Sequence, residues 1–133
     1  MNRARPGPAD LWFLPLGGTG EIGMNLNLYG HDDHWLMIDC GVTFAEHGSK
    51  DPHVQMADPA FIEGERGALC GLVLTHAHED HLGAVAHLWP RLRCPVHCTP
   101  FAAAVLANKL REAGLAGKVP LTVLPPDGPF TVG

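Results

Sequence analysis

The feature that most constrains the fold is an apolar run leading directly into a cluster of metal-binding side chains. Residues 69–74 read Leu-Cys-Gly-Leu-Val-Leu, an unbroken stretch typical of a strand buried on both faces. The sequence Thr75-His-Ala-His-Glu-Asp-His81 follows at once. A hairpin followed by alternating helices and strands, as the rest of the chain predicts, indicates a layered α/β fold, with the site on a loop that a rigid scaffold positions.

The cluster contains three imidazoles and one carboxylate, from His76, His78, Asp80 and His81. Neutral imidazole and carboxylate oxygen suit Zn²⁺ and, less selectively, Mn²⁺ or Fe. Four donors on one turn are too many for a single tetrahedral ion that also holds a water. The spacing therefore indicates two adjacent ions that complete their shells elsewhere. A chance cluster is the alternative, since histidine makes up 9 of the 133 residues, but clustered groups of this kind usually coordinate metals.

The other candidate ligands are expected to have ordinary roles. Glu79 lies between two predicted ligands and is expected to be solvated. The cysteines are expected to be free, buried thiols, because Cys94 and Cys98 have no second pair of thiolates to complete a zinc site. The remaining histidines are expected to be surface or core residues, namely His31, His34, His47, His53, His87 and His97.

Size and charge restrict the class of protein. A chain of 133 residues, 46% of them hydrophobic, fits one soluble globular domain. Its net charge of −5 argues against a general nucleic-acid-binding surface, although a nucleic-acid substrate can still be held through metal ions. No secretory core is present and no apolar run approaches the roughly 18 residues of a membrane span. We therefore expect a cytoplasmic protein without membrane contact.

Hydrophobic periodicity predicts strands alternating with helices. Strands are predicted over residues 11–16, 25–29, 35–38, 69–74, 95–98 and 119–124, with another beginning at 129–132. The second and third strands are expected to form an antiparallel hairpin. Helices are predicted over residues 59–63, 81–89 and 101–113, the second ended by Pro90 and the third capped by Thr99. A loop is expected over 43–57, and residues 1–10 are expected to be a flexible N-terminus.

The segment Gly18-Thr-Gly-Glu-Ile-Gly23 matches the G-x-G-x-x-G pattern of dinucleotide-binding folds. That function requires a helix to open at the third glycine, because the pyrophosphate binds the N-terminus of the helix. Residues 24–29 instead alternate polar and apolar side chains, which is typical of a strand. The glycines are therefore predicted to serve tight turns and close backbone approach.

Three segments occur in a recognisable order: Leu16-Gly-Gly-Thr-Gly-Glu-Ile-Gly-Met-Asn25, Ile38-Asp-Cys-Gly-Val-Thr-Phe44 and Leu74-Thr-His-Ala-His-Glu-Asp-His-Leu-Gly-Ala84. Together they resemble the N-terminal part of the metallo-β-lactamase fold, over about residues 12 to 133. The glycine-rich opening and Thr99-Pro100 resemble the ribonuclease J branch of the β-CASP nucleases. The implied fold for residues 11–133 is the N-terminal half of an αββα sandwich.

The resemblance implies a two-metal hydrolase of RNA phosphodiesters, a 5′-to-3′ exonuclease and in some members also an endonuclease. It places His76 and His78 on one ion and Asp80 and His81 on the other, with two Zn²⁺ expected and Mn²⁺ or Mg²⁺ as alternatives. Asp80 is also the expected catalytic residue, orienting the hydroxide. Asp39 matches the aspartate that braces the metal loop, and a turn carboxylate is its alternative role. The full-length enzyme is expected to be a homo-oligomer.

The chain departs from the family pattern in its second half. Members complete the site with downstream histidines and an aspartate, whereas this chain has no histidine after His97 and no aspartate after that point except Asp127. We therefore expect a truncated domain that binds metal weakly and has no appreciable nuclease activity alone. Two alternative functions remain, a hydrolase of a small thioester or lactone, and a non-catalytic remnant or interaction module.

Overall fold

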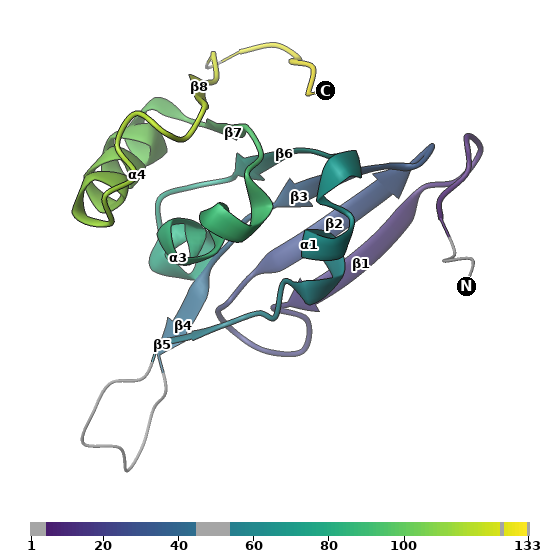
Figure 1. The fold of residues 1–133 in the computed structure, drawn as a ribbon, viewed down its shortest axis with the longest axis horizontal. Helices are drawn as coiled ribbons and strands as arrows, with labels where there is room; N and C mark the ends of the chain where they lie inside the picture. Colours follow the sequence, from purple (N-terminus) through teal and green to yellow (C-terminus); the bar gives the residue numbers. More distant parts are fainter. Residues whose placement is uncertain (1–4, 45–53, 126, 133) are drawn as a thin grey trace.

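An antiparallel unit forms one half of the central sheet in the computed structural model, which describes residues 5–44, 54–125 and 127–132 (Figure 1). Its strands pair in chain order and are β1 (Trp12–Gly17), β2 (Leu26–His31) and β3 (His34–Ile38). Asp32 and Asp33 form the β2–β3 turn with φ of 46° and 63°, the backbone conformation that two-residue hairpin turns require. The predicted hairpin is confirmed.

Parallel strands form the other half of the sheet. They are β6 (Leu69–Leu74), β7 (Val96–Cys98) and β8 (Leu121–Val123). The strand order among the described residues is β1-β2-β3-β6-β7-β8. Parallel neighbours need crossover connections, which are supplied here by α3 (Val85–Leu92) and α4 (Pro100–Glu112). Because Leu74 pairs with Cys98, the loops after β6 and β7 leave the sheet at the same edge.

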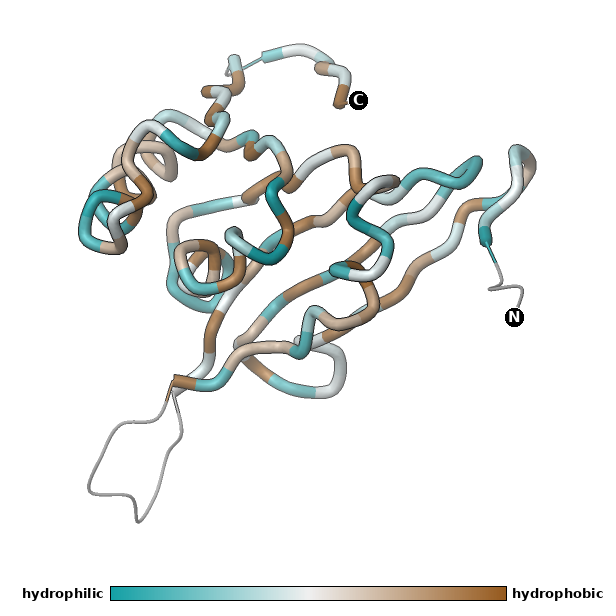
Figure 2. Tube along the Cα trace, in the orientation of Figure 1, coloured by the Kyte–Doolittle hydropathy of each residue, from teal (hydrophilic) through white to brown (hydrophobic). Residues whose placement is uncertain are grey.

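The helices cover one face of the sheet, and the core lies between the two layers (Figure 1). Short elements complete the helical layer, namely α1 (Ala60–Gly64), η1 (Arg66–Ala68) and α2 (Glu79–Leu82). Hydrophobic residues recur along the strands and in helix α3 (Figure 2). Fully buried side chains from the two layers include Leu28, Met37, Leu72, Ile62, Val85 and Leu106. This arrangement confirms the expected α/β layered fold.

A second, small sheet forms where a loop was predicted over residues 43–57. It consists of β4 (Val42–Phe44) and β5 (Val54–Met56), which pair antiparallel. Residues 45–53 lie outside the described part of the chain. The predictions for His47 and His53 fall on that segment.

The predicted helix over 81–89 is wrong in its bounds. The backbone N–H of Ala84 donates to the carbonyl of Cys40 at 3.0 Å, so α2 ends at Leu82 and α3 begins afresh at Val85. Helix α3 then continues through Pro90, where the predicted helix was expected to end, to Leu92. Proline removes one backbone hydrogen bond, and burial of the Leu92 side chain in the core offsets that cost.

The strand predicted to begin at residues 129–132 does not form. This segment instead lies across the sheet face opposite the helices, where the Phe130 ring stacks on His97 with a centroid distance of 6.3 Å. A Cβ atom on Gly71 would lie 2.8 Å from Cγ1 of Val132, so the contact is close.

The chain before β1 is held at its described end. The backbone N–H of Asp33 donates to the carbonyl of Pro6 at 2.8 Å, and the N–H of Asp32 donates to the carbonyl of Gly7 at 3.1 Å. Pro6 is fully buried. The segment expected to be flexible is therefore bound to the β2–β3 turn from Pro6 onward, while residues 1–4 lie outside the described part.

Candidate metal centre

The loop after β6 and the short helix α2 bring three predicted ligands together. One ligand atom from each of His76, Asp80 and His81 lies within 4.8 Å of the other two. The His76 and His81 ring centroids are 3.9 Å apart, and Nε2 of His81 lies 3.4 Å from Oδ2 of Asp80. The three residues are half-buried, so the cluster opens to solvent on one side.

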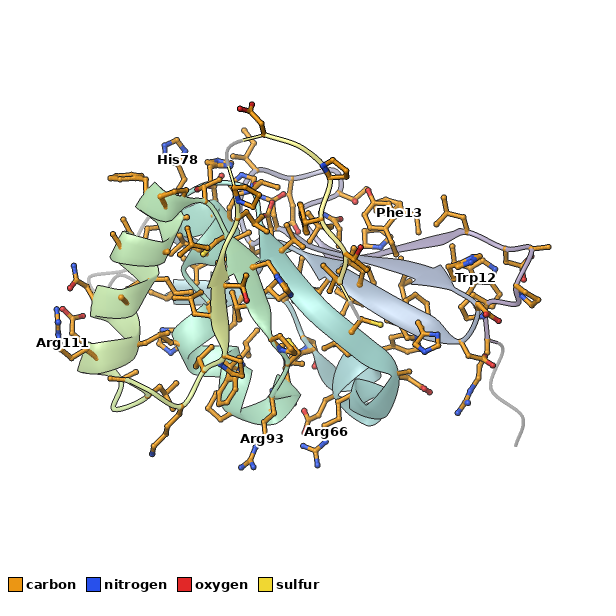
Figure 3. All side chains as sticks on the ribbon, turned by 90° about the horizontal axis from the view of Figure 1, so that it is seen from above. Trp12, Phe13, Arg66, His78, Arg93 and Arg111 are labelled. Atoms are coloured by element: carbon orange, nitrogen blue, oxygen red, sulfur yellow. The ribbon has the colours of Figure 1, made fainter. Side chains whose placement is uncertain are left out.

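The fourth predicted ligand, His78, lies beside this group. Its ring centroid is 4.7 Å from that of His76, and the side chain is exposed. In Figure 3, His78 lies at one end of the molecule near the start of α4, while the labelled Arg66 and Arg93 lie at the opposite end. The Glu79 side chain, expected to be solvated, is 43% exposed and forms an ion pair with Lys109 of α4.

Asp39 lies directly behind the cluster and is 4% exposed. Its Oδ2 is 2.7 Å from Nδ1 of His81, and its Oδ1 accepts a hydrogen bond from the backbone N–H of Thr75 at 2.8 Å. The Thr75 hydroxyl lies 3.0 and 2.9 Å from the two carboxylate oxygens. A buried carboxylate with this many donors is held in one orientation.

These hydrogen bonds determine which imidazole nitrogens are available. Because Asp39 accepts at Nδ1 of His81, that nitrogen carries a proton, and in the neutral imidazole Nε2 then keeps the lone pair. The single hydroxyl proton of Thr75 is donated to Asp39. Nδ1 of His76, 2.9 Å from the Thr75 oxygen, is therefore a donor. Both rings present Nε2 lone pairs, the form in which imidazole binds metal.

Thr75 was not among the functional residues predicted from the sequence. Its position between the end of β6 and the first ligand was the available signal, because a residue there can contact both. Its side chain links Asp39 to His76, so one buried carboxylate orients two of the predicted ligands.

The backbone of the turn after β3 supports the ligand loop. Asp39 has a φ of 64°, a left-handed conformation that aspartate tolerates better than most residues. The chain then turns so that the N–H of Cys40 donates to the carbonyl of His81 at 2.7 Å. Gly41 packs against the same turn, since a Cβ there would lie 1.7 Å from the carbonyl oxygen of Asp80.

The cysteines do not belong to the site. All four are free thiols, as expected. Burial raises the pKa of Cys94 to about 11 and also raises the pKa of the Cys98 thiol. The pKa of Cys40 is raised by burial and, to a smaller extent, by the neighbouring Cys94 and Asp39. Neutral buried thiols are poor metal ligands, because the thiolate is the ligand form.

Comparison with known proteins gives the family. The model of the metallo-beta-lactamase superfamily matches residues 22–131, which include the ligand loop and Asp39. The chain belongs to the metallo-beta-lactamase superfamily. Membership implies divalent metal binding, and the imidazole and carboxylate donors of His76, Asp80 and His81 are chemically suited to such an ion.

Within this superfamily, the chain is similar to several ribonucleases J. It is 44% identical to ribonuclease J of Sinorhizobium meliloti over 92% of this chain and 23% of the relative. It is 35% identical to that of Synechocystis over 87% of this chain and 18% of the relative. It is 38% identical to ribonuclease J of Mycolicibacterium smegmatis over 84% of this chain and 20% of the relative. The chain therefore spans about a fifth of the length of these relatives.

Proposed function

We propose that this chain is part of a ribonuclease J-like, metal-dependent RNA hydrolase that acts as a 5′-to-3′ exonuclease. The observation that carries the proposal is the convergence of His76, Asp80 and His81 in front of the buried Asp39. The similarity to ribonucleases J from several bacteria supports RNA as the substrate. This similarity favours RNA over a small thioester or lactone.

The donor set supports two divalent ions in the complete enzyme. We assign His76 and His78 to one ion and Asp80 and His81 to the other, with Zn²⁺ as the expected metal and Mn²⁺ or Mg²⁺ as alternatives. When bound by these residues, such ions would supply an activated water and positive charge to balance that on the phosphoryl oxygens.

The chain's own residues orient this chemistry. Asp39 holds the tautomer of His81 directly and that of His76 through Thr75, so both imidazoles present Nε2. We assign Asp80 the catalytic role, because its carboxylate can accept a hydrogen bond from the attacking water and so orient the lone pair of that water. Asp39 has no such contact and acts only through the ligands.

RNA, in this proposal, contacts the sheet edge that carries the ligand loop. The labelled Arg66 and Arg93 lie at the other end of the molecule and do not serve that contact (Figure 3).

None of the helices in the described ranges is long and apolar enough to cross a membrane. We further propose a cytoplasmic location and a homo-oligomeric full-length enzyme.

The test uses the full-length gene product with RNA bearing a 5′-monophosphate, and a thioester and a lactone assayed in parallel. We expect metal-dependent RNA degradation that falls at least about 100-fold in His76→Ala, because a metal ligand is lost. The matched control is His31→Ala, whose exposed ring lies on the β2–β3 hairpin away from the ligand group. Thioester or lactone hydrolysis without RNA degradation would contradict the proposal.

For the 133 residues alone, we expect weak metal binding and no appreciable nuclease activity. The described residues offer a single group of three converging ligands, with His78 beside it. Two tetrahedral ions that share a water need more donors than these four. Robust RNA degradation by the purified chain would contradict this expectation.

A further inference from the structure

The glycine-rich segment between β1 and β2 ends at Asn25, which contacts the ligand loop. The side-chain Nδ2 of Asn25 donates to the carbonyl oxygen of Asp80 at 3.0 Å. The backbone N–H of Asn25 donates to the same oxygen at 3.1 Å, and its own carbonyl accepts from the N–H of Gly41 at 2.9 Å. Asn25 therefore joins the ligand turn to the turn that follows β3.

The carbonyl of Asp80 needs such a partner because α2 does not supply one. In a continuing helix this oxygen would accept from the N–H four residues later, which belongs to Ala84. That N–H instead donates to the carbonyl of Cys40. The two donors of Asn25 thus occupy the position that a helical hydrogen bond would fill.

The glycines of the segment leave space for this arrangement. A Cβ on Gly18 would lie 2.4 Å from Oδ1 of Asn25, and a Cβ on Gly17 would lie 2.4 Å from the carbonyl oxygen of Met24. Gly18 also has a φ of 91°, a backbone conformation that favours glycine. The pattern that resembles a phosphate-binding loop therefore shapes the backbone around one asparagine.

We propose that Asn25 is a positioning residue of the metal centre. Asp80 and His81 are consecutive ligands that share a peptide bond, so a rotation of that peptide would displace both side chains. The paired hydrogen bonds of Asn25 to the Asp80 carbonyl prevent the rotation. In addition, Nδ2 of Asn25 lies 3.5 Å from Nε2 of His81, the nitrogen that the Asp39 contact leaves free. This inference rests on the proposed metal centre.

The first measurement is zinc affinity by competition with a chromophoric chelator, on the 133-residue chain. We expect Asn25→Ala to bind zinc about 10-fold to 100-fold more weakly, the range found when a residue that orients ligands is removed. The matched control is Asn27→Ala, the same substitution on the face of β2 opposite the helices, where affinity should stay within about twofold. Equal affinity in Asn25→Ala and the unsubstituted chain would overturn the proposal.

A second measurement needs no metal. The N–H of Cys40 donates to the His81 carbonyl, so its hydrogen exchange reports whether the ligand turn stays docked. We expect Asn25→Ala to accelerate exchange at Cys40 and to leave the amide of Val96, which bonds to Pro120, unchanged. Equal acceleration at both amides would indicate general destabilisation and overturn the positioning role.

Comparison with His76→Ala distinguishes failure of the positioning role from failure of the metal centre. If His76→Ala weakens zinc binding while Asn25→Ala does not, the positioning role alone is overturned. If neither substitution has an effect, the metal centre is overturned as well. Should Asn25→Ala fail to fold, zinc added to the unsubstituted chain should shift the side-chain amide resonances of Asn25 and not those of Asn27. The absence of a shift at Asn25 would overturn the proposal.

Discussion

Asp39 and His81, which are 42 residues apart in the sequence, are joined by a 2.7 Å contact between Oδ2 and Nδ1. The carboxylate is buried and the ring is half-buried, so water competes little for this contact. The same carboxylate accepts two hydrogen bonds from Thr75, one from its backbone and one from its hydroxyl. One carboxylate thereby holds the end of β6, the Thr75 hydroxyl and the proposed metal ligand His81 in place.

Replacing Asp39 by asparagine tests this connection. Asparagine tolerates the left-handed backbone at this position but presents only one oxygen acceptor, so the donors of Thr75 and His81 compete for it. We expect zinc affinity to fall about 10-fold to 100-fold, measured by chelator competition. Asp33→Asn is the control, because Asp33 has a similar φ of 63° in an exposed turn. A similar loss in both variants would contradict the connection.

Gly41→Ala is expected to be strongly destabilising. The added Cβ would lie 1.7 Å from the Asp80 carbonyl oxygen, a backbone atom that cannot move without displacing the ligand turn. We expect the free energy of unfolding in urea to fall by about 3 kcal/mol or more. Gly67→Ala provides the matched control, because its Cβ would have no neighbour within 4 Å. A loss below about 1 kcal/mol at Gly41 would show that the turn can rearrange.

Two leucines of the chain, Leu28 and Leu11, differ in burial. Leu28 on β2 is fully buried between the sheet and the helices, whereas Leu11 is 75% exposed. Leu28→Ala is expected to lower the free energy of unfolding by about 2–5 kcal/mol, through lost burial and the cavity left behind. Leu11→Ala should change it by no more than about 0.5 kcal/mol. Urea denaturation of both variants measures the difference, and equal effects would refute the assigned layers.

The thiols give a pH-dependent prediction. Burial raises the pKa of Cys94 to about 11, so its thiolate fraction at pH 8 is about one in a thousand. Alkylation at pH 8, followed by mass spectrometry, should modify the half-buried Cys70 first. Unfolding exposes Cys94 and returns its pKa to about 9, so the unfolded state loses the proton first. Its contribution to stability is therefore present below pH 9 and is lost as the pH rises toward 11. Alkylation of Cys94 in the folded chain as fast as that of Cys70 would contradict the burial and the raised pKa of Cys94.

Local patterns in the sequence predicted the central elements well. The apolar run over residues 69–74 is β6 with the same bounds, because a strand in the centre of a sheet has mostly apolar side chains, and Cys70 and Val73 are half-buried while the other four residues are buried. The helix predicted over 101–113 is α4, displaced by one residue at each end. Thr99 occupies its N-cap position, but its side chain makes no capping hydrogen bond. The signals in these elements come from neighbouring residues.

Elements that depend on distant partners were predicted less well. The helix predicted over 81–89 divides because Ala84 bonds to Cys40, which is 44 residues earlier, and no periodicity in the helix carries that information. The segment 129–132 was expected to form a strand. Its side chains instead pack on His97 and Gly71, so its conformation depends on the sheet beneath it.

The sequence by itself determined which side chains we propose as metal ligands, because imidazole and carboxylate donors at this spacing after a strand are chemically suited to divalent ions. The tertiary structure decided how those donors are held. Asp39 and Asn25 reach the ligand turn only because β2, β3 and β6 are neighbours in one sheet. Hydrogen bonds act over about 3 Å, so these contacts exist only where the fold brings distant segments together. The pairing of distant strands, which no local pattern encodes, places the glycine-rich segment beside the proposed metal centre.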